Sequence, residues 1–240
     1  VGSVRMCIRD RLSARGHAKV NILTGRPERW MHDICVDTPD GLTLRGKIER
    51  ISNQPSEVIP GADVVLLCLP GFMIEQQLRL LKDYLLPQTF VGSVFSSTGF
   101  CFEAIQNLDA NQPLWGFQRV PFISRVETYG QSAHLLGYKE AHNVAVEQVG
   151  EADKRAFAEL MATWFERPVR LLHNYYEASL TNSNPLLHTS RLYDLWHNWQ
   201  EGITYESIPE FYSNWTDNAS SLLIAMDAEF MQLLDKLQVT

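Results

Sequence analysis

The stretch ADVVLLCLPGFMIEQQLRLL, residues 62–81, decides the fold class. Residues 62–69 form a continuous apolar run, which is typical of a strand buried on both faces of a parallel sheet. Pro70 and Gly71 end this strand, and apolar side chains at helical spacing from Ile74 to Leu81 predict a crossover helix. A buried strand, a turn and a crossover helix in this order predict a doubly wound α/β sheet.

The pattern extends on both sides of this stretch. Residues 18–23, 90–95 and 168–172 have the composition of strands, and residues 4–15 carry an apolar helical stripe that Gly16 would end. Residues 151–165 predict a helix, and from Tyr175 onward the pattern is almost entirely helical, notably over 219–237. We therefore predict a Rossmann-type α/β domain over residues 1–173 and the start of an all-α domain over residues 174–240.

Composition and charge narrow the function classes. With 45% hydrophobic and 20% charged residues, the 240-residue chain is typical of a folded globular protein. A net charge of −7 argues against a nucleic-acid partner, but residues 1–50 hold 10 of the 21 basic and only 6 of the 28 acidic side chains, which predicts a local anionic ligand. Four scattered cysteines without CxxC spacing, and the lack of a long apolar run, indicate a cytoplasmic protein with no metal site and no membrane partner.

The first residues are compatible with a dinucleotide-binding turn. Such a turn follows a strand, has the pattern GxGxxG and opens a helix. Counting back from Gly16 places Gly2 at the second glycine, with Ser3 beside it in the turn, while the first glycine and the first strand would precede Val1. Gly2 could equally be an ordinary terminal glycine, and Arg5 stands where the pattern has a small residue. We therefore expect the sequence to be shorter than the protein it comes from.

The end of the next strand bears on the choice of cofactor. An acidic residue there would hold the ribose 2′-hydroxyl of NAD, whereas a hydroxyl or guanidinium accommodates the 2′-phosphate of NADP. Thr24 and Arg26 follow residues 18–23, and Glu28 is the first acid after them. This order favours NADP over NAD, with the alternative that Arg26 is only a solvated turn residue.

Several segments together resemble the octopine/nopaline (opine) dehydrogenase family. They occur in the family's order and extend over nearly the whole chain: Ile22-Leu23-Thr24 with Pro27-Glu28-Arg29-Trp30, Leu69-Pro70-Gly71-Phe72, Ser97-Thr98-Gly99-Phe100-Cys101-Phe102, Val120 to Arg125 with Tyr129-Gly130, and Asn184-Pro185-Leu186-Leu187-His188-Thr189. The last motif, with Tyr193, Trp196 and Phe211-Tyr212 after it, is the most specific.

The resemblance implies an enzyme that acts on CH–NH bonds. Members of the family condense an amino acid with a 2-oxo acid and reduce the resulting imine with NADH or NADPH. They combine a Rossmann domain with a helical domain of the 6-phosphogluconate dehydrogenase C-terminal type. The expected partners are therefore two small-molecule substrates, and a homodimer is left open as the assembly.

His188 is the expected catalytic residue. Reduction of an imine needs a side chain that exchanges a proton near neutral pH, and histidine suits this task. A solitary histidine is more often structural, but the motif around His188 matches the catalytic motif of the family, in which Asn184 and Thr189 would orient a substrate carbonyl or carboxylate. The resemblance places the carboxylate that polarises His188 beyond Thr240. We assign the other histidines to the surface or the core: His17, His32, His134, His142, His173 and His197.

The loops after the predicted strands should carry the ligand contacts, because open α/β sheets bind at the carboxyl ends of their strands. Leu69, Pro70 and Gly71 would then contact the cofactor. Ser97 follows the strand at 90–95, and Ser124 with Arg125 follows a third extended run. The resemblance implies that both serines face the substrate, while Arg125 would either clamp a substrate carboxylate or form an internal ion pair.

Five aromatic residues crowd the segment after His188, and their spacing favours core packing over a place in the substrate pocket: Trp196, Trp199, Phe211, Tyr212 and Trp215. Two other functions remain as alternatives. One is a ketopantoate-reductase-like or other 2-hydroxyacid dehydrogenase, which would reduce a carbonyl without an amine. The other is an NAD(P)-binding regulatory relative without catalysis, for which Arg5 is the main indication.

Overall fold

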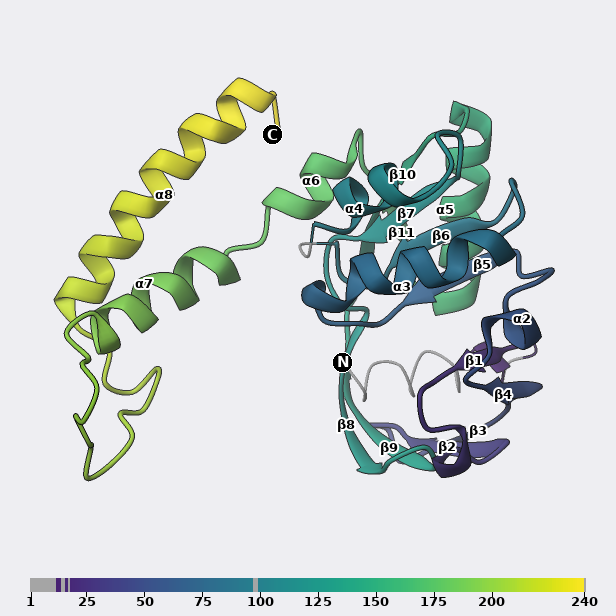
Figure 1. Ribbon diagram of the computed structural model, residues 1–240, viewed down its shortest axis with the longest axis horizontal. Helices are drawn as coiled ribbons and strands as arrows, with labels where there is room; N and C mark the ends of the chain where they lie inside the picture. Colours follow the sequence, from purple (N-terminus) through teal and green to yellow (C-terminus); the bar gives the residue numbers. More distant parts are fainter. Residues whose placement is uncertain (1–11, 14–15, 17, 97–98, 240) are drawn as a thin grey trace. The chain divides into compact units, whose positions relative to one another are not determined.

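The computed structural model describes residues 12–13, 16, 18–96 and 99–239 (Figure 1). Contacts divide the chain into two compact units, Val1–Ser179 and Leu180–Thr240, which we describe separately. The sequence pattern places the boundary near residue 173, and the difference is helix α6 (Tyr175–Leu180). The side chain of Tyr175 is buried in the core of the first unit, and its hydroxyl donates a hydrogen bond to the Ser96 carbonyl over 2.7 Å. This anchoring explains why most of α6 belongs with the α/β unit.

A five-stranded sheet forms the centre of the first unit. Its order is β11 (Val169–Leu171), β10 (His142–Glu147), β7 (Leu114–Phe117), β6 (Phe90–Ser93) and β5 (Val64–Leu67). The strands predicted within 62–69, 90–95 and 168–172 are confirmed. The sheet is mixed rather than parallel throughout, because β10 runs antiparallel to β7. The chain between these two strands forms further strands instead of a crossover helix, so it returns in the opposite direction.

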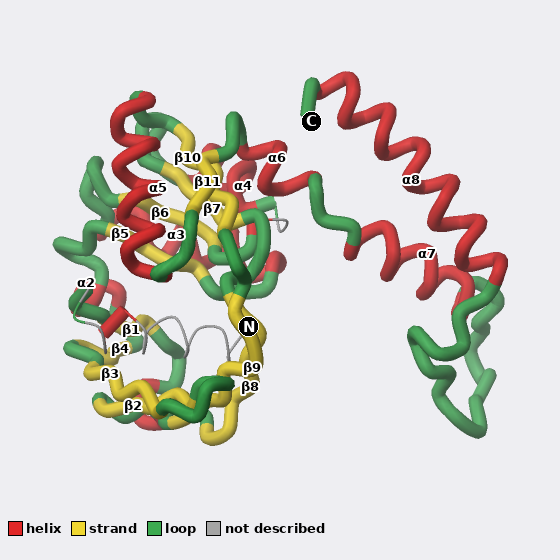
Figure 2. Tube along the Cα trace, turned by 180° about the vertical axis from the view of Figure 1, so that it is seen from behind, coloured by secondary structure: helices red, strands yellow, loops and turns green. Residues whose placement is uncertain are grey.

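Helices cover both faces of this sheet (Figures 1 and 2). Helix α5 (Glu151–Phe165) packs on one face through side chains such as Phe157 and Met161, and α3 (Ile74–Leu81) and α4 (Phe100–Asn107) pack on the other. Both α3 and α5 have the bounds that the apolar periodicity predicts. The buried side chains of α3, Ile74, Leu78 and Leu81, recur at the spacing that places them on one helical face.

Gly92 on β6 makes room for a tryptophan on the neighbouring strand. Gly92 pairs with Trp115 of β7, and a Cβ atom at Gly92 would lie 2.3 Å from two atoms of the indole. Trp115 is 0% exposed and packs against Phe117 and Phe157, with ring centroids 5.4 and 5.3 Å away. A side chain at position 92 would therefore occupy the same space as the largest buried residue of the sheet.

A second, two-stranded sheet pairs β1 (Asn21–Leu23) with β4 (Arg50–Ser52) in parallel, and α2 (Pro55–Val58) follows β4. The strand predicted within 18–23 is thus confirmed. Most of the helix predicted at 4–15 lies outside the described residues. Gly16, which should end that helix, has φ of +68°, and its N–H donates a hydrogen bond to the Ser13 carbonyl over 3.0 Å, as in a glycine helix cap.

A third sheet of four strands is a feature that the sequence analysis did not predict. Its order is β3 (Thr43–Lys47), β2 (Asp33–Asp37), β9 (Ser132–Tyr138) and β8 (Phe122–Thr128). Residues 33–37 alternate between exposed and less exposed side chains, and Pro39-Asp40-Gly41 lies in the turn before β3. An alternating strand followed by a Pro-Asp-Gly turn is typical of a β-hairpin, and here it joins β2 to β3. The pairing of β2 with β9 joins segments far apart in the chain, which local patterns do not show.

The second unit consists of two helices and the segment between them. Helix α7 (Asn184–Trp196) packs against α8 (Asp217–Leu237), which confirms the helix predicted at 219–237. The Thr216 hydroxyl caps α8 by accepting a hydrogen bond from the Ala219 N–H over 3.0 Å. Among the described helices, none combines the length and the apolar character needed to cross a membrane.

Three short 3-10 turns complete the described elements: η1 (Pro27–Arg29), η2 (Gly71–Met73) and η3 (Lys82–Tyr84). The turn η2 connects β5 to α3, so the loop that the sequence assigns to the cofactor is itself ordered as a turn of helix.

Candidate functional site

The loop after β5 lies where an open α/β sheet binds ligands. Leu69, Pro70 and Gly71 are half-buried and follow the carboxyl end of β5, which is parallel to β6. The Pro70 carbonyl accepts a hydrogen bond from the Met73 N–H over 3.0 Å, which fixes the turn. Phe72, at the centre of the loop, is 87% exposed. The loop thus presents a rigid backbone and an exposed aromatic ring at the end of a parallel strand.

Thr24 and Arg26 lie directly after β1. The Thr24 hydroxyl accepts a hydrogen bond from the Arg26 N–H over 3.4 Å, and the Thr24 N–H donates to the Ser52 carbonyl over 3.0 Å. The Arg26 side chain is exposed and has no ion-pair or hydrogen-bond partner in the described part of the chain. A solvated, uncommitted guanidinium is available for an anionic ligand. Gly2 and Ser3, the other residues expected to bind cofactor, lie outside the described residues.

Of the two serines expected at the substrate, Ser97 also lies outside the described residues, and Ser124 has a different setting from the one predicted. The chain leaves β7 at Phe117 and enters β8 at Phe122, so Ser124 and Arg125 lie inside a strand rather than after one. This corrects the expectation. The Ser124 hydroxyl is buried and has no hydrogen-bond partner among the described residues, while the Arg125 guanidinium donates to the Ser124 carbonyl over 3.2 Å.

His188 lies early in α7, the helix that the Asn-Pro-Leu-Leu-His-Thr motif begins. Pro185 lies in the first turn, where its missing N–H costs nothing. Asn184 and His188 are four residues apart and therefore share one face of the helix, whereas Thr189 lies further around it. All three side chains are exposed. The motif thus presents an amide and an imidazole side by side to solvent.

Two aromatic side chains from the segment between the helices contact the His188 imidazole. The ring of Phe211 meets it edge to face, with centroids 5.3 Å apart and an interplanar angle of 89°. The Tyr212 hydroxyl oxygen lies 3.4 Å from His188 Nε2. The favoured interpretation of the five aromatic residues after His188 as core residues is wrong for this unit, because none of them is buried. Instead, two of them surround the expected catalytic residue.

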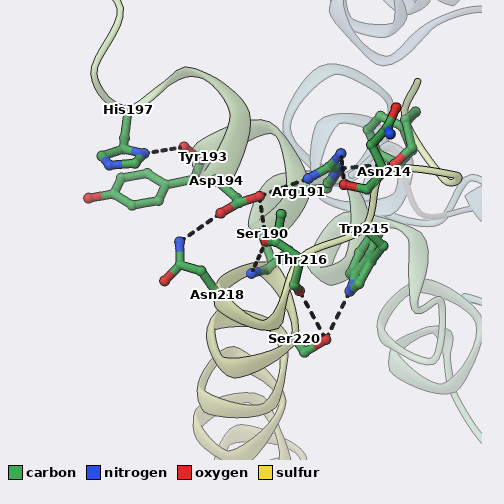
Figure 3. Close-up of polar contacts among 12 residues, drawn as sticks. Ser190, Arg191, Tyr193, Asp194, His197, Asn214, Trp215, Thr216, Asn218 and Ser220 are labelled. Atoms are coloured by element: carbon green, nitrogen blue, oxygen red, sulfur yellow. Dashed lines mark hydrogen bonds and ion pairs between the residues drawn. The ribbon is translucent and has the colours of Figure 1, made fainter. Parts of the chain in front are cut away.

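A buried arginine connects this segment to α7 (Figure 3). The Arg191 guanidinium donates to the carbonyls of Phe211 and Asn214 over 2.9 and 2.6 Å, and to the Asp194 carboxylate over 2.8 Å. Asp194 also accepts hydrogen bonds from Asn218 and Thr216 over 2.7 and 2.8 Å. Hydrogen bonds from Asn218, then Thr216 and Arg191, hold the pKa of Asp194 below its ordinary value, because they stabilise the carboxylate. Sequence reasoning missed this network.

Two other histidines, His197 and His173, make hydrogen-bonding contacts at the ends of helices. His197 Nδ1 lies 3.0 Å from the Tyr193 carbonyl, and the two rings stack with centroids 5.2 Å apart. His173 Nδ1 lies 2.8 Å from the carboxylate of Glu177. That carboxylate also accepts the His173 N–H, and the Glu177 N–H donates to the Asn174 side chain, which together cap α6. These contacts favour structural roles for both residues.

One group of side chains has the chemistry of metal ligands. Asp37, Glu127 and His134 each place one ligand atom within 4.8 Å of the others on the four-stranded sheet. The two imidazole nitrogens, however, face different carboxylates, at 3.6 Å from Asp37 and 3.4 Å from Glu127. This geometry is that of a histidine between two acids rather than that of three ligands around one ion.

Comparison with known proteins finds a family model that matches the C-terminal part of the chain. Residues 171–240 match the family model for the α-helical domain of NAD/NADP octopine/nopaline dehydrogenase. The chain is 31% identical over 202 residues to the uncharacterized protein y4xO of Sinorhizobium fredii, covering 80% of this chain and 52% of that protein. It is 25% identical over 241 residues to tauropine dehydrogenase of Arabella iricolor, covering 93% and 60%. The chain thus spans about half to three fifths of the length of these relatives.

Solved structures share the fold. An octopine dehydrogenase described with NADH and L-arginine superimposes with a TM-score of 0.83 at 21% identity, covering 98% of this chain and 62% of that one. A yersinopine dehydrogenase with NADP+ bound gives a TM-score of 0.70 at 14% identity, covering 99% and 63%. The related structures therefore include both nicotinamide cofactors. The family model over residues 171–240, the curated relatives and the shared fold therefore all indicate similarity to the octopine/nopaline dehydrogenase family.

Proposed function

We propose that this chain is the greater part of an NAD(P)H-dependent opine dehydrogenase, which joins an amino acid to a 2-oxo acid and uses His188 as its general acid and base. The observation that carries this proposal is the match of residues 171–240 to the helical domain of the family, which includes His188 on an exposed helix face beside Asn184. The same match favours this function over the reduction of a 2-oxo acid to a 2-hydroxy acid without an amine, and over a regulatory role.

The residues of the first unit suit a nicotinamide dinucleotide. Half-buried Leu69, Pro70 and Gly71 at the end of β5 offer a close backbone approach to a flat ring, and Arg26 offers an uncommitted positive charge after β1. When bound, the cofactor supplies a hydride. We propose NADP as the preferred cofactor, because Arg26 and Thr24 stand where an NAD-binding site would place an acid.

The proton chemistry is assigned to His188. The amine of the amino acid attacks the carbonyl carbon of the 2-oxo acid, and loss of water gives an imine whose carbon accepts the hydride while its nitrogen takes a proton. An exposed imidazole can give a proton to the departing oxygen and take one from the attacking nitrogen near neutral pH. Asn184, on the same helix face, can bind a substrate carboxylate through its amide. The balanced products are the secondary amine, the oxidised cofactor and water.

Substrate dependence tests the reaction type. With NADPH and a 2-oxo acid such as pyruvate, we expect oxidation of the cofactor only after an amino acid is added, because the hydride acceptor forms from both substrates. The measurement is the loss of nicotinamide absorbance together with mass spectrometry of the product. Turnover with the 2-oxo acid alone, giving a 2-hydroxy acid, would contradict the proposal and support the 2-hydroxyacid dehydrogenase alternative.

The Arg26→Ala variant tests the cofactor assignment. We expect it to weaken NADPH binding about tenfold or more and to leave NADH binding unchanged, because a charge-assisted hydrogen bond to the 2′-phosphate contributes about 1.5–3 kcal/mol. The measurement is fluorescence titration of both cofactors. Arg29→Ala is the matched control, since the Arg29 guanidinium already lies over the Tyr129 ring, 5.3 Å from its centroid. Equal losses for NADH and NADPH would refute the role of Arg26.

A further inference from the structure

Arg191 is a fully buried cation in a unit whose other described side chains are largely exposed. The residue is 0% exposed, although it lies in the middle of α7, which has solvent on much of its surface. Burying a charged group is costly unless hydrogen bonds and an opposite charge compensate it. The Asp194 carboxylate compensates the charge, but Arg191 directs two of its three nitrogens elsewhere, to main-chain carbonyls.

Those carbonyls belong to one short segment, residues 210–214. Nε of Arg191 donates to Phe211, and the second terminal nitrogen donates to Asn214 over 2.6 Å and to Glu210 over 3.4 Å. The Asn214 side chain in turn accepts the Glu210 N–H over 3.1 Å, which closes the segment on itself. The guanidinium therefore fixes the backbone of residues 210–214 against α7; Figure 3 labels Arg191 and Asn214, two of the residues involved.

The same segment carries the two side chains that contact His188. Phe211, whose carbonyl Arg191 holds, places its ring edge to face against the imidazole, and Tyr212 places its hydroxyl 3.4 Å from Nε2. The two aromatic rings also contact each other, with centroids 4.8 Å apart. On α7, Arg191 lies three residues after His188 and so on the adjacent turn of the same face. One side chain thus connects the helix that carries His188 to the segment that surrounds it.

We propose that Arg191 is a positioning residue for His188, which acts by holding residues 210–214 so that Phe211 fixes the plane of the imidazole and Tyr212 sets the proton position on its ring. A phenolic hydroxyl that donates to Nε2 leaves the proton of the neutral imidazole on Nδ1. A general acid and base works only when its ring and its proton are aimed at the reacting atom. This inference rests on the proposed function for its catalytic meaning, while the arrangement itself is independent of it.

The Arg191→Lys variant separates positioning from folding. A lysine keeps the charge next to Asp194 but lacks the planar fork that reaches the carbonyls of Phe211 and Asn214 together. We expect a folded protein in which the ring-current shift of the His188 Cε1–H resonance is lost in a spectrum of 13C-histidine-labelled protein. We also expect kcat to fall about 10- to 100-fold, the scale of a small misplacement of a catalytic group, with the KM for the cofactor unchanged.

Thr216→Ala is the matched control for stability. It removes the cap of α8 and one hydrogen bond to Asp194, so it destabilises the same unit without touching residues 210–214. We expect a lower midpoint of thermal unfolding and an unchanged His188 resonance. A second variant, Tyr212→Phe, should keep the ring-current shift and change only the 15N shifts that report which imidazole nitrogen carries the proton.

The wild-type protein provides the decisive measurement if Arg191→Lys fails to fold. Nuclear Overhauser contacts between the His188 and Phe211 rings are expected, and their absence would overturn the proposal. A folded Arg191→Lys variant with wild-type His188 resonances would also overturn it. Failure of the proposed function is distinguishable, since it would abolish the activity results for every variant and leave the resonance results as stated.

Discussion

Replacing His188 with asparagine is expected to lower kcat about 10²- to 10⁴-fold, the usual contribution of a general acid and base. Asparagine keeps a polar group of similar size on the exposed face of α7, so the fold should survive and cofactor binding should be unchanged. The measurement is steady-state kinetics with the amino acid, the 2-oxo acid and NADPH, with cofactor binding measured separately by fluorescence.

His197→Asn is the matched control for this substitution. His197 ends the same helix, is also exposed, and has Nδ1 at 3.0 Å from the Tyr193 carbonyl. Its replacement should leave kcat within about twofold of the wild-type value, because surface substitutions usually change little. A His188→Asn variant with full activity, or an equal loss in both variants, would show that His188 is not the proton carrier.

Replacing Gly92 with alanine is expected to destabilise the protein by about 3 kcal/mol, at the upper end of the range for overpacked cores. The added Cβ would lie 2.3 Å from the buried indole of Trp115, which Phe117 and Phe157 prevent from moving aside. The measurement is the free energy of unfolding from urea denaturation followed by circular dichroism.

A double-mutant cycle identifies the cause of that destabilisation. Trp115→Leu alone should cost about 3 kcal/mol through lost burial and a cavity. In that background Gly92→Ala should cost less than about 1 kcal/mol, since the cavity can accept a methyl group. The two substitutions should therefore be strongly non-additive, by about 2 kcal/mol. Additive costs would show that the strand itself, and not the indole, requires glycine at position 92.

Regular elements with one clear apolar stripe were predictable from the sequence. Helix α5 has the predicted bounds, because its buried side chains recur at helical spacing and Gly150 precedes it. The four-stranded sheet was not predicted. A strand such as β3, Thr-Leu-Arg-Gly-Lys, has only one buried residue, and the pairing of β2 with β9 joins distant parts of the chain. Local periodicity carries no information about such long-range pairing.

Some features of the candidate site were also predictable from the sequence, and others were not. The i, i+4 spacing of Asn184 and His188 already places them on one helix face, and the structure agrees. The contacts of Phe211 and Tyr212 with His188 had no periodic signal, because they lie in an irregular segment whose path depends on hydrogen bonds to Arg191. A buried arginine in α7 cannot be told from a solvated one by its neighbours in the sequence. The displacement of Ser124 into β8 likewise follows from where β7 ends.

The hydrogen bonds of Arg191 have a consequence for how the segment beside His188 can be varied. Three of the groups that the guanidinium binds are main-chain oxygens of Glu210, Phe211 and Asn214, and every amino acid supplies such an oxygen. The side chains at 211 and 212 can therefore be exchanged without loss of the attachment that holds them beside His188. Substitutions at positions 211 and 212 therefore change the side chains beside His188 while the main-chain hydrogen bonds to Arg191 stay the same. Libraries randomised at these two positions alone are the direct way to alter the surroundings of the His188 imidazole.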